Sequence, residues 1–176
     1  MGNMEQAVFL NEEALNLRQA IFDSSAKEIA YNINSLGSIY TDLGDVQKGE
    51  KAYRDAFRIF KLQLDENHPH TWNVASNLSA SSGKLGDIKG AIEMLSLYLR
   101  VHEEQGLYHD LMSEYLNMGA YYNSLNHADR AMPYMLKSFV IADSILPEPH
   151  FSRANIYDGI GGLYISKSNI NKLIRY

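Results

Sequence analysis

Apolar residues recur at helical spacing along almost the whole of this 176-residue chain. The first such run is Ala7, Leu10, Ala14, Leu17 and Ile21, and two later runs are Tyr53, Ala56, Phe57, Phe60 and Leu64, and Leu111, Tyr115, Met118, Tyr122 and Leu125. Steps of three and four residues place side chains on one face of an α-helix, whereas a strand would alternate. The proline-containing segments 67–70 and 146–150 interrupt the pattern and are expected to end helices. The pattern predicts an all-α fold.

A short segment repeats four times at nearly constant spacing. The copies begin at Leu36, Leu78, Met118 and Ile160, so the repeat period is about 40 residues. In the same registers, a second segment repeats as Leu43-Gly44-Asp45, Leu85-Gly86-Asp87 and Leu125-Asn126-His127. Gly accepts a left-handed backbone and Asp caps the helix that follows, so this second segment predicts the turn between two paired helices. A fixed period of this length indicates a helical repeat array.

Small residues mark where the paired helices are expected to meet. Gly37, Ser79, Gly119 and Gly161 share one register of the first helices, and Gly49, Ala91 and Ala131 share one register of the second helices. Small side chains at matched positions allow two helices to approach closely. Gly159 and Gly162 lie in the same helical pattern as Gly161, and all three are interpreted as packing positions.

The order of these residues resembles the tetratricopeptide repeat (TPR). The signature positions are matched by Leu36, Gly37, Tyr40, Gly49, Tyr53 and Ala56. The long period and the loop 65–71 look more like the longer kinesin-light-chain type of repeat than the standard one. The resemblance implies a right-handed α-solenoid of antiparallel helix pairs. Ser82 replaces an aromatic residue of the pattern, and Asn126-His127 replaces Gly-Asp.

The registers divide the chain into one TPR-like domain over residues 1–176. We expect a partial unit at 1–28, whole units at about 29–70, 71–108 and 109–150, and a partial unit at 151–176. Gly2-Asn3 falls one repeat period before Gly44-Asp45, so the chain is expected to start with the second helix of a unit. A solenoid normally ends in a polar cap. We therefore expect a fragment of a longer protein, the alternative being a naturally short chain that caps itself or dimerises.

Composition removes several classes of function. Lys+Arg 16 against Asp+Glu 21 gives a formal charge of −5, which argues against general nucleic-acid binding. No cysteine is present, so disulfides and thiol chemistry are excluded. No run approaches the roughly 20 apolar residues that span a bilayer, and the first residues lack the pattern of a secretory signal. We expect a cytoplasmic protein that binds neither membranes nor nucleic acid.

The chain shows no convincing catalytic, metal or cofactor motif. His68 and His70 flank Pro69 near Asp65, but such a His-Pro loop is also found in the resembling repeats. His102 and His109 are seven residues apart, instead of the four that a His-Glu-x-x-His zinc helix requires. No nucleophile elbow, phosphate loop or dinucleotide fingerprint is present. We expect no enzyme activity, no cofactor and no metal.

Two polar surfaces remain as binding candidates. Lys51, Arg54, Arg58 and Lys61 form a basic stripe on a second helix, which we interpret as a solvated outer face. In the resembling family the first helices line a concave groove. The resemblance places the following residues there: Tyr31, Asn34, Ser38, Asn73, Asn77, Ser113, Asn117, Asn123, Asn155 and Asp158. Asn is a mediocre helix former whose carboxamide both donates and accepts hydrogen bonds, as a peptide group does.

The predicted function is therefore a scaffold that binds a protein or an extended peptide in this groove. The groove lacks the paired Lys and Arg that would clamp an acidic tail, so a neutral to weakly basic peptide is the expected ligand, with an apolar anchor near Tyr31, Tyr121 or Tyr122. One alternative is a regulatory or sensory TPR region of a larger signalling protein, such as a kinase or a transcription regulator. Another is an architectural module that self-associates through its uncapped ends.

Overall fold

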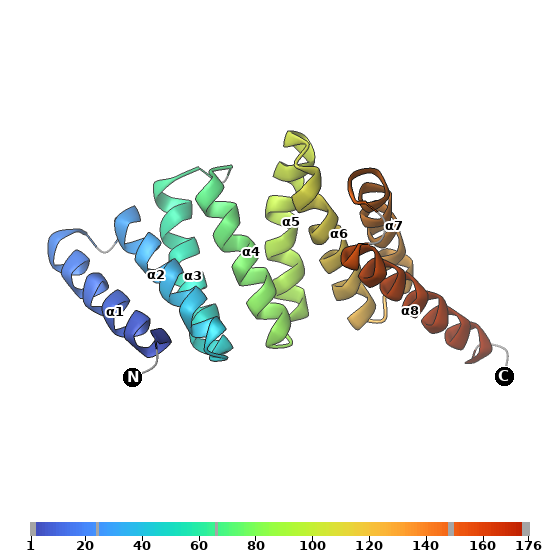
Figure 1. Ribbon diagram of the computed structural model, residues 1–176, viewed down its shortest axis with the longest axis horizontal. Helices are drawn as coiled ribbons and strands as arrows, with labels where there is room; N and C mark the ends of the chain where they lie inside the picture. Colours follow the sequence, from blue (N-terminus) through green and yellow to red (C-terminus); the bar gives the residue numbers. More distant parts are fainter. Residues whose placement is uncertain (1–2, 24, 66, 148–149, 174–176) are drawn as a thin grey trace. The chain divides into compact units, whose positions relative to one another are not determined.

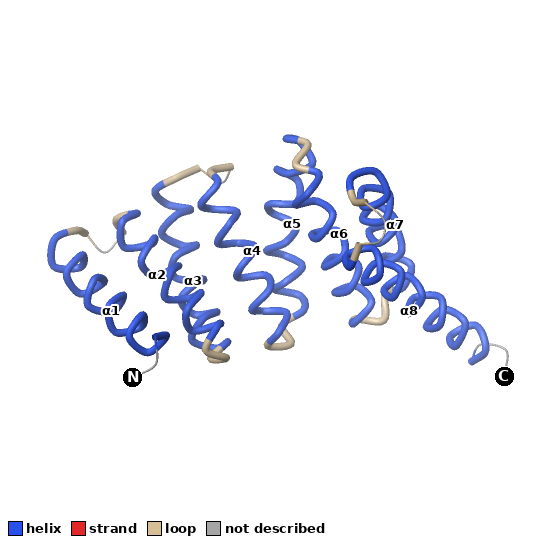
Figure 2. The backbone as a smooth tube through the Cα atoms, in the orientation of Figure 1, coloured by secondary structure: helices blue, strands red, loops and turns tan. Residues whose placement is uncertain are grey.

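The computed structural model describes residues 3–23, 25–65, 67–147 and 150–173, and in these ranges it contains helices and turns but no strand (Figure 1, Figure 2). The helices are α1 (Asn3–Ile21), α2 (Lys27–Asp42), α3 (Val46–Gln63), α4 (Pro69–Lys84), α5 (Ile88–Gln105), α6 (Tyr108–Ser124), α7 (Ala128–Ile145) and α8 (Phe151–Leu173). The predicted all-α class is confirmed.

The helices form two compact units, one reaching Tyr98 and the other starting at Leu99, and α5 contributes to both. In the first unit, α2 packs against α3, α1 packs against α2, and α4 packs against α3. In the second unit, α6 packs against α7, and α8 contacts both of them. Each helix thus lies beside its neighbour in sequence, which is the packing expected of repeated helix pairs.

The turns inside the pairs follow the sequence prediction at two positions and depart from it at a third. Gly44 has φ +86°, and the carboxylate of Asp45 accepts a hydrogen bond from the Lys48 amide at 3.1 Å. The second turn, Gly86-Asp87, repeats this geometry. In the third turn the left-handed position is Asn126, with φ 60°, and the next residue makes no side-chain cap.

Close approach at the small residues is confirmed in three pairs. A Cβ atom on Gly37 would lie 2.7 Å from Cε1 of Tyr53, and a Cβ atom on Gly49 would lie 2.9 Å from the Gly37 carbonyl oxygen. In the next pair, the buried Ser79 hydroxyl donates to the Ala91 carbonyl at 2.8 Å. In the third pair, a Cβ atom on Gly119 would lie 2.5 Å from Cγ of Met135.

The packing prediction is wrong for Gly161 and Gly162. No described atom lies within 4 Å of a Cβ atom placed on either residue. The reason is that α8 packs on Ala131 and Met135 through Ile160 and Leu163 instead. Gly159 does pack as predicted, because its Cβ would lie 3.0 Å from Sδ of Met135.

Each unit has its own core. In the first unit, buried residues of α2, α3 and α4 cluster together: Ile29, Ala30, Ala56, Ile59, Phe60 and Val74. In the second unit, Ala131 and Met135 of α7 pack with Leu163 of α8, and Tyr122, Met132 and Ile160 cover them. These cores hold the first helices of each helix pair in place and leave one side of each exposed. The first helices are α2 and α4 in the first unit, and α6 and α8 in the second.

Candidate functional site

All ten residues of the predicted groove lie on first helices, and none of them is buried. Three are half-buried, namely Asn34, Asn77 and Asn123, and the others are exposed, namely Tyr31, Ser38, Asn73, Ser113, Asn117, Asn155 and Asp158. The predicted positions alternate with buried core residues along each helix, so within each unit most of them lie on the exposed face of the first helices. Ligand binding by this face stays a prediction.

In the first unit this face combines free amides with one aromatic ring. In the described part of the chain, no hydrogen bond joins the side chain of Asn73 or Asn77 to another residue. The Asn34 Oδ1 atom is buried and also lacks a partner there. The Tyr31 ring, 36% exposed, packs edge-on against Phe60 at 5.0 Å and His70 at 4.7 Å between ring centroids. Tyr31 is thus a fixed apolar wall beside unused amide groups.

In the second unit the same registers recur on α6 and α8. Ser113 lies one repeat period after Asn73, and Asn155 lies one further period after Ser113. Asn117 lies one period after Asn77, and its side chain makes no hydrogen bond within the described ranges. The Ser113 hydroxyl, in contrast, donates to the Asp110 carbonyl at 3.0 Å. Amide groups are therefore available on α6 as they are on α4.

Two of the predicted groups are oriented differently from the rest. Asn123 lies six residues after Asn117, so it points about 120° away from it around α6. Tyr122 stacks on Tyr134 with centroids 5.7 Å apart, and the Arg130 guanidinium lies 5.9 Å from the Tyr122 ring. The Tyr122 ring therefore belongs to the packing between α6 and α7.

The second unit contains a buried acid–imidazole pair that residue type alone does not reveal. Oε1 of Glu114 on α6 lies 2.6 Å from Nδ1 of His102 on α5, and both side chains are buried. Burial raises the pKa of Glu114 to about 8, with help from the charges of Asp110 and Glu103. Burial also lowers the pKa of His102, against the charge of Asp110. Both shifts favour a neutral pair in which the Glu114 hydroxyl donates to the imidazole.

The repeat registers indicate that both residues of this pair are buried. Glu114 occupies the position of Val74 and Ile156, and His102 occupies the position of Phe60 and Ala142. All four of those residues are buried. Burial of Glu114 and His102 could thus have been predicted by comparing registers.

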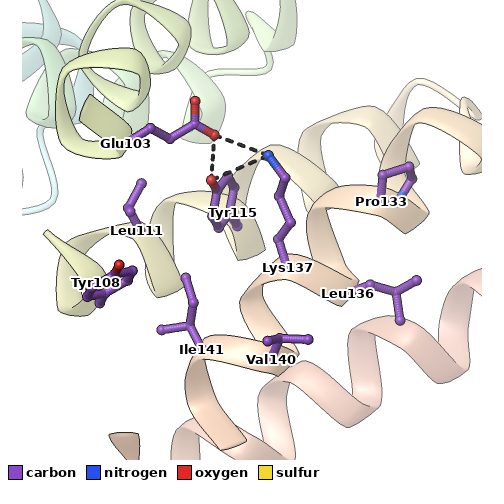
Figure 3. A pocket seen from close by; sticks show the side chains of 9 residues that line it. All are labelled: Glu103, Tyr108, Leu111, Tyr115, Pro133, Leu136, Lys137, Val140 and Ile141. Carbon is purple, nitrogen blue, oxygen red and sulfur yellow. Dashed lines mark hydrogen bonds and ion pairs between the residues drawn. The ribbon is translucent and has the colours of Figure 1, made fainter. Parts of the chain in front are cut away.

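A second polar cluster lies beside this pair and joins three helices. The carboxylate of Glu103 on α5 accepts hydrogen bonds through one oxygen, Oε1, from the Tyr115 hydroxyl and from Nζ of Lys137 on α7, the latter at 3.1 Å (Figure 3). The hydrogen bond from Tyr115 holds the pKa of Glu103 below its usual value. Partial burial lowers the pKa of Lys137. Its hydrogen bonds to Glu103 and Tyr115 raise that pKa by more, so the net shift is upward. All three groups keep their ordinary charges at neutral pH.

The cluster closes one end of an open cleft of about 620 Å³. Apolar side chains of α6 and α7 line the rest of it, as Figure 3 shows: Tyr108, Leu111, Pro133, Leu136, Val140 and Ile141. The sequence does not reveal this cleft, because the residues that line it look like ordinary parts of helical stripes.

His68, in the loop before α4, caps that helix. Nδ1 of His68 accepts a hydrogen bond from the His70 amide at 3.2 Å. Throughout the described residues, no three His, Asp or Glu side chains come together as a metal would require. Among the same residues, no helix is both long and apolar enough to span a membrane.

Comparisons with known proteins define the class of this fold. Residues 26–104 match the family model described as tetratricopeptide repeat. The nearly identical TPR-like repeats assigned to a kinesin light chain of Podosopora anserina have a similar structure, with a TM-score of 0.80 and 16% identity over 97% of this chain and 82% of that one. No curated protein sequence matches the chain. The resemblance is confirmed: residues 26–104 match the tetratricopeptide repeat, and the fold is similar to that of kinesin-light-chain TPR-like repeats.

Two further solved structures share the fold. BtubC (BKLC) from P. vanneervenii gives a TM-score of 0.70 and 21% identity over 97% of this chain and 69% of its own. The apo form of RapI gives a TM-score of 0.76 and 15% identity; 98% of this chain aligns, but only 46% of RapI. The fold class is thus an α-solenoid of the TPR type, a scaffold architecture associated with protein interactions.

Proposed function

We propose that this protein is a scaffold that binds extended peptides on the exposed faces of its first helices. One peptide-binding surface is formed by α2 and α4 in the first unit, and another by α6 and α8 in the second. The observation that carries the proposal is the recurrence of unused amide groups in one register, at Asn77 and Asn117, beside the polar register that begins at Tyr31 and Asn73.

The chemistry of these surfaces favours recognition of a peptide main chain. A carboxamide offers both a donor and an acceptor, and so can satisfy both polar groups of a peptide unit. Tyr31, held by Phe60 and His70, offers a flat apolar wall for one side chain of the ligand. The exposed middle of α2, α4 and α6 carries amides and hydroxyls instead of Lys or Arg. A neutral to weakly basic peptide fits this chemistry better than an acidic tail, and the mechanism is binding without catalysis.

The test is selection from a random peptide library on immobilised protein, followed by affinity measurement of the selected peptides. Asn77→Ala and Asn117→Ala are compared singly and together, with Asn16→Ala, an exposed asparagine of α1, as the matched control. We expect the double variant to lose about tenfold or more in affinity, since each lost hydrogen bond is worth about 1 kcal/mol. The control and the unfolding midpoint are expected to stay unchanged.

Equal affinity of the wild type and the double variant would contradict the proposal, and unfolding of the double variant would show that these residues are structural. The first alternative is a regulatory TPR region of a larger signalling protein. A second alternative, self-association, is favoured by the exposed apolar residues of the end helices, Leu17 and Ile21 on α1 and Tyr164 on α8. A mass that increases with concentration in light scattering would support it.

A further inference from the structure

The outward-facing registers of the second helices differ in chemistry from one helix to the next. Three registers are exposed on all three helices: Lys51, Arg54 and Arg58 on α3, Glu93, Ser96 and Arg100 on α5, and Pro133, Leu136 and Val140 on α7. The fold therefore accepts charged and polar side chains at these positions. On α7 the same positions are apolar.

Packing within the unit does not account for these apolar residues. Leu136 is 46% exposed and Val140 is 65% exposed, so both leave much of their surface in water. Tyr108, across the cleft on α6, is 61% exposed. Single exposed apolar residues are common, but a row at helical spacing that lines a cleft indicates an interaction surface.

The charged end of the cleft specifies the chemistry of a partner. Oε1 of Glu103 is occupied by Tyr115 and Lys137, as Figure 3 shows. Its Oε2 atom accepts no hydrogen bond from any described residue, and the Glu103 side chain is 40% exposed. Asp110 and Glu104 are exposed on the neighbouring turns of α6 and α5. Lys137 supplies one positive charge beside the three carboxylates of Glu103, Asp110 and Glu104, so the second oxygen of Glu103 can still accept from a cationic donor.

We infer that this cleft binds a short amphipathic helix of a partner protein, one that carries Lys or Arg beside its apolar row. The residues Pro133, Leu136 and Val140 recur at steps of three and four, so they form a ridge that matches the apolar row of a second helix. The basic flank of that helix binds Glu103. This surface is separate from the first-helix surfaces proposed above, because its apolar ridge is on α7.

The test uses synthetic helical peptides as probes. A Lys-flanked peptide with one Leu row is compared with a Glu-flanked peptide that has the same row, and with a scrambled Lys peptide, by fluorescence anisotropy. The wild type is expected to bind the Lys-flanked peptide about tenfold or more tightly than either of the others. Nuclear magnetic resonance shifts are expected at Leu136, Val140 and Tyr115.

Two variants and two controls locate the binding. Leu136→Ser with Val140→Arg gives α7 the residues that α5 carries, and is expected to weaken binding about tenfold or more. Glu103→Gln is expected to reduce the preference for the Lys flank. Leu62→Ser, at a residue 70% exposed on α3, is expected to change nothing. Asn77→Ala with Asn117→Ala is also expected to leave this binding intact, so this proposal and the first-helix proposal fail independently.

Three outcomes would overturn the inference. The first is equal affinity for Lys-flanked and Glu-flanked peptides, and the second is equal affinity of the wild type and the α7 variant. The third is a dimer in sedimentation that the α7 variant converts to monomer, because the occupant would then be a second copy of the chain.

Discussion

The two units place a polar residue at the same buried register and bond it to different partners. In the first unit the residue is Asn32, whose Nδ2 donates to the Asn11 carbonyl of α1 at 3.2 Å. In the second unit it is Glu114, which meets His102 of α5 at 2.6 Å. In both cases a first helix is tied to the helix before it. The amide is neutral at every pH, whereas the acid is kept neutral only by burial, so the second unit alone acquires a pH-dependent contact at this register.

The paired helices of the two units also pack through different side chains. Between α2 and α3, Gly37 meets Gly49 and the rigid ring of Tyr53. Between α6 and α7, Gly119 meets Ala131 and the flexible side chain of Met135. An unbranched thioether adapts to its surroundings more readily than an aromatic ring. The first unit is therefore expected to tolerate less change at this contact than the second.

The largest expected effect comes from filling these contacts. Gly37→Leu would force the Tyr53 ring and the α3 backbone away, and is expected to cost about 3 kcal/mol or more of the free energy of unfolding. Gly119→Leu displaces Met135 and is expected to cost about 1–3 kcal/mol. Urea unfolding of both variants gives the comparison. Gly161→Leu is the control, and because no described atom contacts this position, it should be neutral or slightly stabilising.

A larger cost for Gly119→Leu than for Gly37→Leu would show that Met135 is held as rigidly as Tyr53. Destabilisation by Gly161→Leu would show that α8 is packed on that side as well, as the register shared with Gly37 and Gly119 predicts.

The glycine contacts and the turn at Gly44 could be predicted from sequence, because they depend on small residues and on repeat registers. Glu114 could not be placed by residue type, since an acid in a helix is ordinarily exposed. Only its alignment with Val74 and Ile156 indicates burial, and the distance to His102 depends on how α5 and α6 pack. The cleft beside Lys137 cannot be predicted for a related reason. An apolar residue of a helical stripe gives the same sequence pattern whether it is exposed or buried.

The next effect is the pH dependence of stability. In the folded protein the pKa of Glu114 is raised to about 8 from an ordinary 4.5. The folded protein therefore keeps a proton that the unfolded chain releases in this interval, so stability falls as pH rises from about 4.5 to about 8. The lowered pKa of His102 acts only below its ordinary value of 6.5. Between pH 6.5 and 8 we expect the wild type to lose about 2 kcal/mol.

Two reciprocal variants check this assignment by urea unfolding at several pH values. Glu114→Gln keeps a donor for His102 and is expected to flatten the fall between pH 6.5 and 8. Asn32→Asp introduces a buried acid into the first unit and is expected to create a similar fall there. An unchanged slope in Glu114→Gln would mean that Glu114 is already ionised in the folded protein.

The smallest expected effect concerns the turns inside the helix pairs. These turns also differ between the two units. Asn126 adopts φ 60° and His127 makes no side-chain cap, whereas Gly44 and Asp45 supply both features. Replacing Asn126 by Gly and His127 by Asp is expected to stabilise the second unit by about 1 kcal/mol, mainly through the new cap on α7. The reverse exchange, Gly44→Asn with Asp45→His, is expected to destabilise the first unit by a similar amount. Native-state hydrogen exchange of α7 and α3 reads out each unit separately. If one exchange stabilises its unit and the other destabilises its unit, the difference in stability comes from the turn residues. If both exchanges change stability in the same direction, it comes from the helices that the turns connect.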